Sequence, residues 1–371
     1  MTVNRIQSWA QLGQRIASAR KAAGLTQEFL AEELGLDRSA VSRLESGDRQ
    51  LDTLELSRIA EILDRSIEWF LTQSSPAIVS RRAMVPDIPT ERLRVEALIE
   101  ELSLGIELLI GSGTLTPLSP LRTRGIDNLA QAEERAAEVR NTAGAQQGAL
   151  RNLAAFGESI GIFGFSLAVG PPATLDGSYV LTDAGGLTLI NGANDSGRRR
   201  FTFAHEIGHH VLADEYSTDW DVIIGGEGRE KLINAFAIHL LMPRVAVVAR
   251  WQELNGREDP RSAAIVLGAE FGVSWSAVCA HLRNLELIAP TNHLHLVETP
   301  PRRIDYVERD LGTIEELAPP TVPPRYAAAV IKAFKKHKIS ERRALELLRG
   351  TVQANDLPEP DRIPVEAAGD L

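Results

Sequence analysis

The sequence predicts a mainly α fold that carries a small β-sheet, an α+β architecture spread over more than one domain. Apolar residues follow helical spacing through most of the chain, whereas short β-like runs are confined to residues 160–191. The chain has 371 residues, of which 44% are hydrophobic, so it can bury more than one core. We therefore expect two or three domains.

Shifts in composition place the expected domain boundaries. Glycines mark turns between the helices expected at the start of the chain. The run that follows these helices, SSPAIVSRRAMVPDIP, has the composition of a linker. The expected division is a helical domain at 1–73, a linker with a helical segment at 74–125, an α+β domain at 126–290, and a helical region with a tail at 291–371.

Charge and cysteine content narrow the class of protein. The formal net charge of −10 argues against binding nucleic acid over the whole surface, although a small local patch could still bind it. Cys279 is the single cysteine, so an internal disulfide is excluded. The chain shows neither a signal-peptide pattern at its start nor a run of eighteen apolar residues, so we expect a cytoplasmic protein without membrane contact.

Two short helices near the N-terminus are separated by a tight turn. Thr26 and Asp37 are expected to cap them, and Gly35 breaks the chain between them. The second helix of such a helix-turn-helix can lie in the major groove of DNA. The expected exposed positions on it, suited to bases or phosphates, are Arg38, Ser39, Ser42 and Arg43. The alternative is an αα-hairpin used only for packing or protein contacts.

Residues 9–71 resemble the XRE (Cro/C1-type repressor) domain throughout, including the T-Q pair that opens the second helix and the S-R-L-E-S-G end of the third. The resemblance implies a five-helix domain that binds double-stranded operator DNA, in which Gln27 contacts the backbone and supports the recognition helix. Such domains usually act as homodimers on two half-sites. Residues 91–110 could serve dimerisation or plain core packing, and nine basic against eleven acidic residues in 1–71 argue against high affinity of a monomer.

The run FTFAHEIGHHV at residues 201–211 has the pattern of a metal site. His205 and His209 are four positions apart, so on a helix both rings leave the same face. Neutral imidazole is the commonest protein ligand for zinc, and Glu206 is placed to act as the general base of a metallopeptidase. The alternative is a helix in which the histidines serve packing.

A third ligand is expected from the helix that follows. Glu230 shares the apolar face that is defined by Ile233 and its helical neighbours, and a carboxylate in that position needs a partner. Glu227, in a glycine-rich loop, is its rival. Three acidic residues lie closer to the histidines in sequence, but their polar stretch is typical of a solvated loop: Asp214, Glu215 and Asp219.

The run RFTFAHEIGHH followed by E-x-x-x-N-x-F-A-x-x-L-L-M-P resembles the ImmA/IrrE family of metallopeptidases over roughly residues 126–290. The resemblance implies that His205, His209 and Glu230 bind Zn²⁺ and that Glu206 is catalytic. It also implies a protein substrate, since family members act on DNA-binding repressors, often during stress or mobile-element transfer. Many relatives carry an acidic residue where this chain has Leu232.

Two functions remain open from the sequence. In the first, a DNA-anchored zinc endopeptidase cleaves a repressor or the product of a neighbouring gene, and the strand LTLIN holds the substrate by strand addition. In the second, a transcription regulator uses a metallopeptidase-like domain to sense a ligand or partner. Tyr216 and His239 are both possible proton donors opposite the base, and the sequence does not choose between them.

Overall fold

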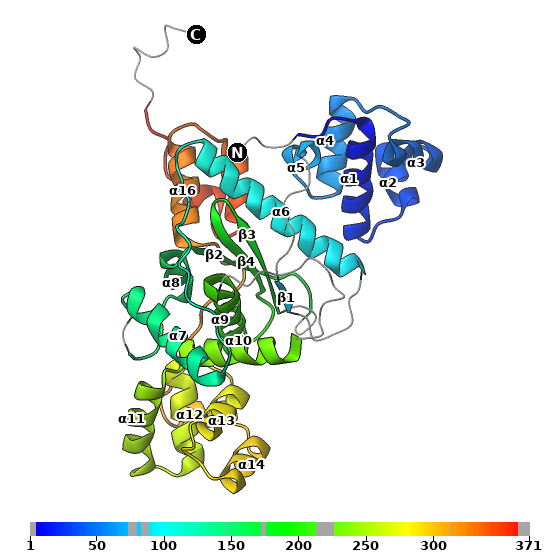
Figure 1. The fold of residues 1–371 in the computed structure, drawn as a ribbon. Helices are drawn as coiled ribbons and strands as arrows, with labels where there is room; N and C mark the ends of the chain where they lie inside the picture. Colours follow the sequence, from blue (N-terminus) through cyan, green and yellow to red (C-terminus); the bar gives the residue numbers. More distant parts are fainter. Residues whose placement is uncertain are drawn as a thin grey trace. The chain divides into compact units, whose positions relative to one another are not determined.

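Helices make up most of the described chain in the computed structural model, with one small sheet (Figure 1). The structure describes residues 5–72, 80–82, 89–145, 147–171, 176–212, 226–312 and 314–362. The prediction of a mainly α fold with a small β-sheet is confirmed. The chain forms two compact units: Met1–Ala77 with Val85–Gly111, and Ile78–Met84 with Ser112–Leu371.

The first unit is helical and its turns agree with the capping pattern in the sequence. Its helices are α1 (Trp9–Ala22), α2 (Gln27–Leu34), α3 (Arg38–Ser46), α4 (Thr53–Ile62), α5 (Ile67–Leu71) and α6 (Pro89–Gly111). Thr26 accepts from the Phe29 amide and Asp37 from the Ala40 amide, so each caps its helix as expected. Gly35 lies between α2 and α3 at φ +68°, a left-handed conformation that glycine adopts without strain.

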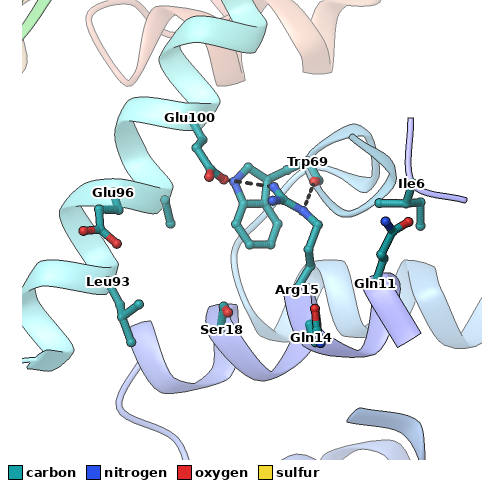
Figure 2. Close-up of a pocket in the computed structure, with 10 residues that line it drawn as sticks. Ile6, Gln11, Gln14, Arg15, Ser18, Trp69, Leu93, Glu96 and Glu100 are labelled. Atoms are coloured by element: carbon teal, nitrogen blue, oxygen red, sulfur yellow. Dashed lines mark hydrogen bonds and ion pairs between the residues drawn. The ribbon is translucent and has the colours of Figure 1, made fainter. Parts of the chain in front are cut away.

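An arginine fastens α6 to the helices that precede it (Figure 2). The Arg15 guanidinium on α1 lies 3.8 Å above the Trp69 ring, donates to the Trp69 carbonyl at 2.8 Å, and donates to Glu100 Oε2 on α6 at 2.9 Å. Ala97 and Leu104 of α6 lie in the hydrophobic core of this unit. Core packing is therefore one role of the apolar segment 91–110, while dimerisation stays a prediction.

The second unit combines the sheet with the remaining described helices. These are α7 (Leu129–Thr142), α8 (Leu153–Ser159), α9 (Ser196–Leu212), α10 (Gly226–Leu241), α11 (Arg244–Asn255), α12 (Pro260–Phe271), α13 (Trp275–Asn284), α14 (Pro290–Glu298), α15 (Arg303–Val307), α16 (Pro324–Lys335) and α17 (Glu341–Leu348). Within the described parts of the chain, no single helix is long and apolar enough to cross a membrane, and two bent helix pairs reach that length and composition only when each pair is counted together.

The sheet has the strand order β1-β3-β4-β2. Its strands are β1 (Ser80–Arg82), β2 (Ile162–Leu167), β3 (Gly177–Thr182) and β4 (Gly185–Asn191). β3 and β4 form an antiparallel hairpin, β2 runs parallel to β4, and β1 is antiparallel to β3. The expectation that L-T-L-I-N in β4 holds a substrate by strand addition is wrong, because β2 and β3 already pair with both edges of β4.

Helix α9 packs against β3 and β4 on one side and against α10 on another. The α9–α10 contact is close because Gly208 has no side chain, and a methyl group added there would lie 3.1 Å from both Ile233 Cγ2 and Phe236 Cδ1. Ile233, Phe236 and Leu240 of α10 are fully buried in the core of this unit. This packing brings the polar face at the start of α10 to the histidines of α9.

Candidate metal centre

Two histidines of α9 turn their rings toward one point. His205 Nε2 and His209 Nε2 are 3.0 Å apart, and both side chains are almost fully buried. The helix dictates this arrangement, since residues four apart are neighbours on one face. Burial by the sheet and by α10 keeps both rings away from bulk solvent.

Glu230, on the first turns of α10, completes a cluster of three donor groups. Its Oε2 lies 3.3 Å from His205 Nε2, and its Oε1 lies 3.6 Å from His209 Nε2. The three ligand atoms lie within 4.8 Å of one another, and this is the one group of its kind among the described residues. The Glu230 side chain is 47% exposed, so solvent reaches the cluster from the side of the acid.

The separations in this cluster match the size of a tetrahedral zinc site. Ligand bonds of about 2.0–2.1 Å place the ligand atoms of a tetrahedron about 3.3 Å apart. The observed separations of 3.0, 3.3 and 3.6 Å bracket that value. Two imidazoles with one carboxylate are also a donor set that zinc accepts. The residues present therefore fit a zinc ion.

Asn234, one turn after Glu230, orients the first histidine. Its Oδ1 lies 3.0 Å from His205 Nδ1. A carbonyl oxygen only accepts, so the Nδ1 of His205 carries the proton and its Nε2 presents a lone pair to the cluster. The sequence showed Asn234 on the same face as Glu230, but its hydrogen bond to a histidine of another helix was missed.

Glu206 lies beside the cluster, under the first residue of β3. Its side chain is fully buried. A methyl group on Gly177 would lie 2.6 Å from Thr202 Cγ2 and 3.1 Å from Glu206 Oε1, so the strand approaches the acid this closely only with glycine at this position. The carboxylate is thereby held between α9 and β3, directly after His205 and three positions before His209 in sequence.

Comparison with known families finds a match in two segments of the chain. Residues 16–70 match the family model described as helix-turn-helix, and residues 171–283 match the one described as the IrrE N-terminal-like domain. The chain therefore carries a helix-turn-helix segment followed by an IrrE N-terminal-like segment. Both resemblances seen in the sequence are thus confirmed, and the second assigns a metallopeptidase-like domain. Searches of curated proteins and of solved structures each gave no significant match.

A buried pair at His210, the residue after His209, ties α9 of the IrrE-like domain to the sheet. The Tyr179 hydroxyl of β3 lies 2.8 Å from His210 Nδ1, and His210 Nε2 lies 3.1 Å from the Ile160 carbonyl. His210 therefore donates from Nε2 and accepts from Tyr179. Burial lowers the pKa of His210 to about 4 and raises that of Tyr179 to about 12, so both groups are neutral. The tyrosine was missed because no local pattern marks it.

Of the two suggested proton donors, the structure describes His239 but not Tyr216. His239 contacts other partners, with its Nε2 3.7 Å from Glu133 Oε2 and its ring 4.8 Å from that of His281. Tyr216 lies outside the described residues, as do Asp214, Glu215 and Asp219. The side chain of Glu227, the rival acid, is also outside them, and Leu232 packs partly buried against the core.

The helix-turn-helix domain presents the expected polar positions on α3 to solvent. Arg38, Ser39, Ser42 and Arg43 are all exposed. The Ser39 hydroxyl donates to Asp37 Oδ1 at 2.6 Å, and this hydrogen bond lowers the pKa of the Asp37 carboxyl. Three of the four side chains thus remain for contacts outside the domain, whereas Ser39 already has a local partner.

Gln27 lies at the start of α2 and contacts α3. Its Nε2 donates to Glu45 Oε2 at 2.8 Å, and Arg20 of α1 donates to both oxygens of the same carboxylate, at 2.5 and 3.0 Å. The glutamate is therefore a junction of three helices. Support of α3 by Gln27 has a visible contact in this arrangement, and its contact with DNA stays a prediction.

Proposed function

We propose that the chain is a DNA-binding regulator whose IrrE-like domain is a zinc-dependent endopeptidase. One observation carries the proposal: His205, His209 and Glu230 converge from two helices beside a buried glutamate. The two histidines come with Glu206 from a single helix, in the order that metallopeptidases use. The family match to an IrrE N-terminal-like domain supports the same conclusion.

The three converging side chains would hold the zinc ion, and Asn234 would keep His205 in the tautomer that binds it. Zinc bound there supplies Lewis-acid polarisation of a peptide carbonyl and of water. Burial of the His205 and His209 rings helps this chemistry, because low-dielectric surroundings strengthen electrostatic interactions.

Glu206 would act as general base and then as general acid. Its carboxylate accepts a proton from the attacking water and passes it to the leaving amine when the peptide C–N bond breaks. The packing of Gly177 over Glu206 Oε1 limits the motion of the acid, so the proton acceptor stays in one place during the reaction.

The helix-turn-helix domain would bring this activity to DNA. Arg38 and Arg43 are suited to guanine or phosphate, and Ser42 to a tolerant hydrogen bond. Two copies of the chain would bind an operator as a homodimer. The substrate would be a DNA-binding repressor or the product of a neighbouring gene, cleaved under stress to change transcription.

The test compares wild type with Glu206→Gln in cells. The amide is nearly isosteric and cannot accept the proton of water, so cleavage should fall by about 10²–10⁴ while zinc content and DNA binding are retained. Asp183→Asn, at an exposed acid of the β3–β4 turn, is the matched control. Whole-proteome peptide termini and reporter output are measured after DNA damage and other stresses. Identical termini and output in wild type and Glu206→Gln would reject the peptidase and favour a non-catalytic sensor.

A further inference from the structure

The sheet of the second unit has part of each edge covered by another part of the chain. At the β2 edge, the amides of Ser166 and Thr321 each donate to the carbonyl of the other, at 2.9 and 2.8 Å. At the β3 edge lies β1, whose residues 80–82 come from the segment that joins α5 to α6. An edge strand offers free backbone donors and acceptors, so whatever covers it decides what else can pair there.

The β3 edge is the one that adjoins Glu206. Gly177 is the residue of β3 that approaches the Glu206 carboxylate, and in the register of the sheet it pairs with Arg82. Paired strands lie about 4.8 Å apart. The backbone of β1 therefore runs one strand spacing from the residue that packs on the proposed base.

We propose that the β3 edge is the surface on which an extended substrate peptide binds, and that β1 occupies it in cis as a built-in competitor. This inference rests on the proposed peptidase function. A peptide added as a strand gains backbone hydrogen bonds without a sequence requirement, while side-chain pockets set its specificity. The antiparallel pairing of β1 with β3 is one of the two directions that such a peptide can take.

The length of β1 makes it displaceable. It pairs with Gly177, Ser178 and Tyr179, whereas β3 continues through Val180–Thr182. Within the described residues, no strand pairs with the outer edge of that second half. A substrate strand that pairs along the whole of β3 forms more backbone hydrogen bonds than β1, but it must overcome the effective concentration of a short tether, on the order of millimolar.

Peptide binding tests the proposal without any need for catalysis. The probe is a fluorescent peptide with the sequence of residues 77–85, measured by anisotropy on the full-length, zinc-loaded Glu206→Gln chain. Replacement of residues 78–84 by seven alternating Gly and Ser residues keeps the linker length and removes the competitor. We expect the probe to bind this variant at least tenfold more tightly than the chain with its native linker, and a scrambled peptide to bind neither.

A single substitution provides a second, milder perturbation. Arg82 pairs with Gly177, whose backbone N–H and C=O face β1, so proline at position 82 removes a donor from the β1–β3 ladder, and Arg82→Pro should also increase probe affinity. Hydrogen exchange at the amides of Gly177 and Tyr179, which face β1, should rise at least tenfold in both variants and fall again when the probe is added. Equal probe affinity with and without the native linker, or unchanged exchange in β3, would overturn the proposal.

Two outcomes separate this inference from the proposed function. If wild type cleaves cellular proteins while the probe binds no variant, the peptidase stands and the β3 edge is not its substrate surface. If the intact mass of zinc-loaded wild type reveals a cut within residues 78–84 that Glu206→Gln lacks, β1 is a substrate of the site, and its role as a competitor is rejected.

Discussion

Removal of the Asn234 side chain should weaken zinc binding although Asn234 does not contact the ion. Its Oδ1 accepts from His205 Nδ1 at 3.0 Å and so fixes the ring and the tautomer of a ligand. Loss of such an outer hydrogen bond typically costs 10–100-fold in metal affinity, about 1.4–2.8 kcal/mol. Asn234 is only partly buried, so water can replace part of the lost bond. We therefore expect Asn234→Ala to weaken zinc affinity by about tenfold, the lower end of that range.

The assay is competition for zinc between the protein and a chromophoric chelator at neutral pH. Asn234→Asp keeps an acceptor oxygen in place and should bind zinc about as well as wild type. Lys231→Ala is the control for mutation of α10, because Lys231 is exposed on the same helix. Circular dichroism and thermal melting confirm that each variant retains the fold.

One result would refute this reasoning directly. If Asn234→Ala holds zinc within twofold of wild type while His205→Ala loses it, the hydrogen bond does not orient the ligand. A loss in Lys231→Ala as large as that in Asn234→Ala would show instead that any change in α10 disturbs the site.

Three further predictions follow from the same structure. Glu230→Ala should lower zinc affinity by at least tenfold and Glu227→Ala should leave it unchanged; the reverse pattern in a chelator competition would identify Glu227 as the ligand. Arg38→Ala and Arg43→Ala should weaken operator binding and each reduce the slope of log K against log salt by about 1 if it contacts a phosphate, and unchanged slopes would remove these residues from the interface. Burial lowers the pKa of His281 to about 4 from 6.5, so the folded state disfavours its protonation. The contribution of His281 to the free energy of unfolding should therefore be complete above pH 6.5, and about 3 kcal/mol of it should be lost as the pH falls toward 4. Urea unfolding of His281→Gln should show a correspondingly flatter profile in that range, and a profile parallel to that of wild type would exclude His281 as the source.

Several features could be predicted from the sequence because they depend on neighbours along the chain. The caps Thr26 and Asp37 bond amides three residues ahead, and Gly35 satisfies a local backbone requirement. The spacing of His205 and His209 sets their common face through helix geometry alone. The β3–β4 hairpin likewise follows from two β-like runs around a short turn.

Other features could not be predicted because they join elements that are distant in the sequence. Tyr179 lies 31 positions before its partner His210, and no periodicity links a strand residue to a histidine on a later helix. The role of α6 is a similar case, since an apolar helix has the same sequence pattern whether it packs on its own domain or on a second copy of the chain. Its ion pair between Arg15 and Glu100 spans 85 positions.

The sequence by itself determined the two domain types and the residues of the H-E-x-x-H helix, since helical periodicity, capping and motif spacing are local properties. The sequence favoured Glu230 over Glu227 as the third ligand, and the tertiary structure adds how Glu230 meets the histidines, because the packing of α10 on α9 at Gly208 brings it within 3.3 Å of His205 Nε2. The tertiary structure also decided that β4 is an inner strand and that residues 80–82 cover the β3 edge. Strand order depends on which backbone edges remain free once the whole sheet has formed, and that is a property of the assembled fold.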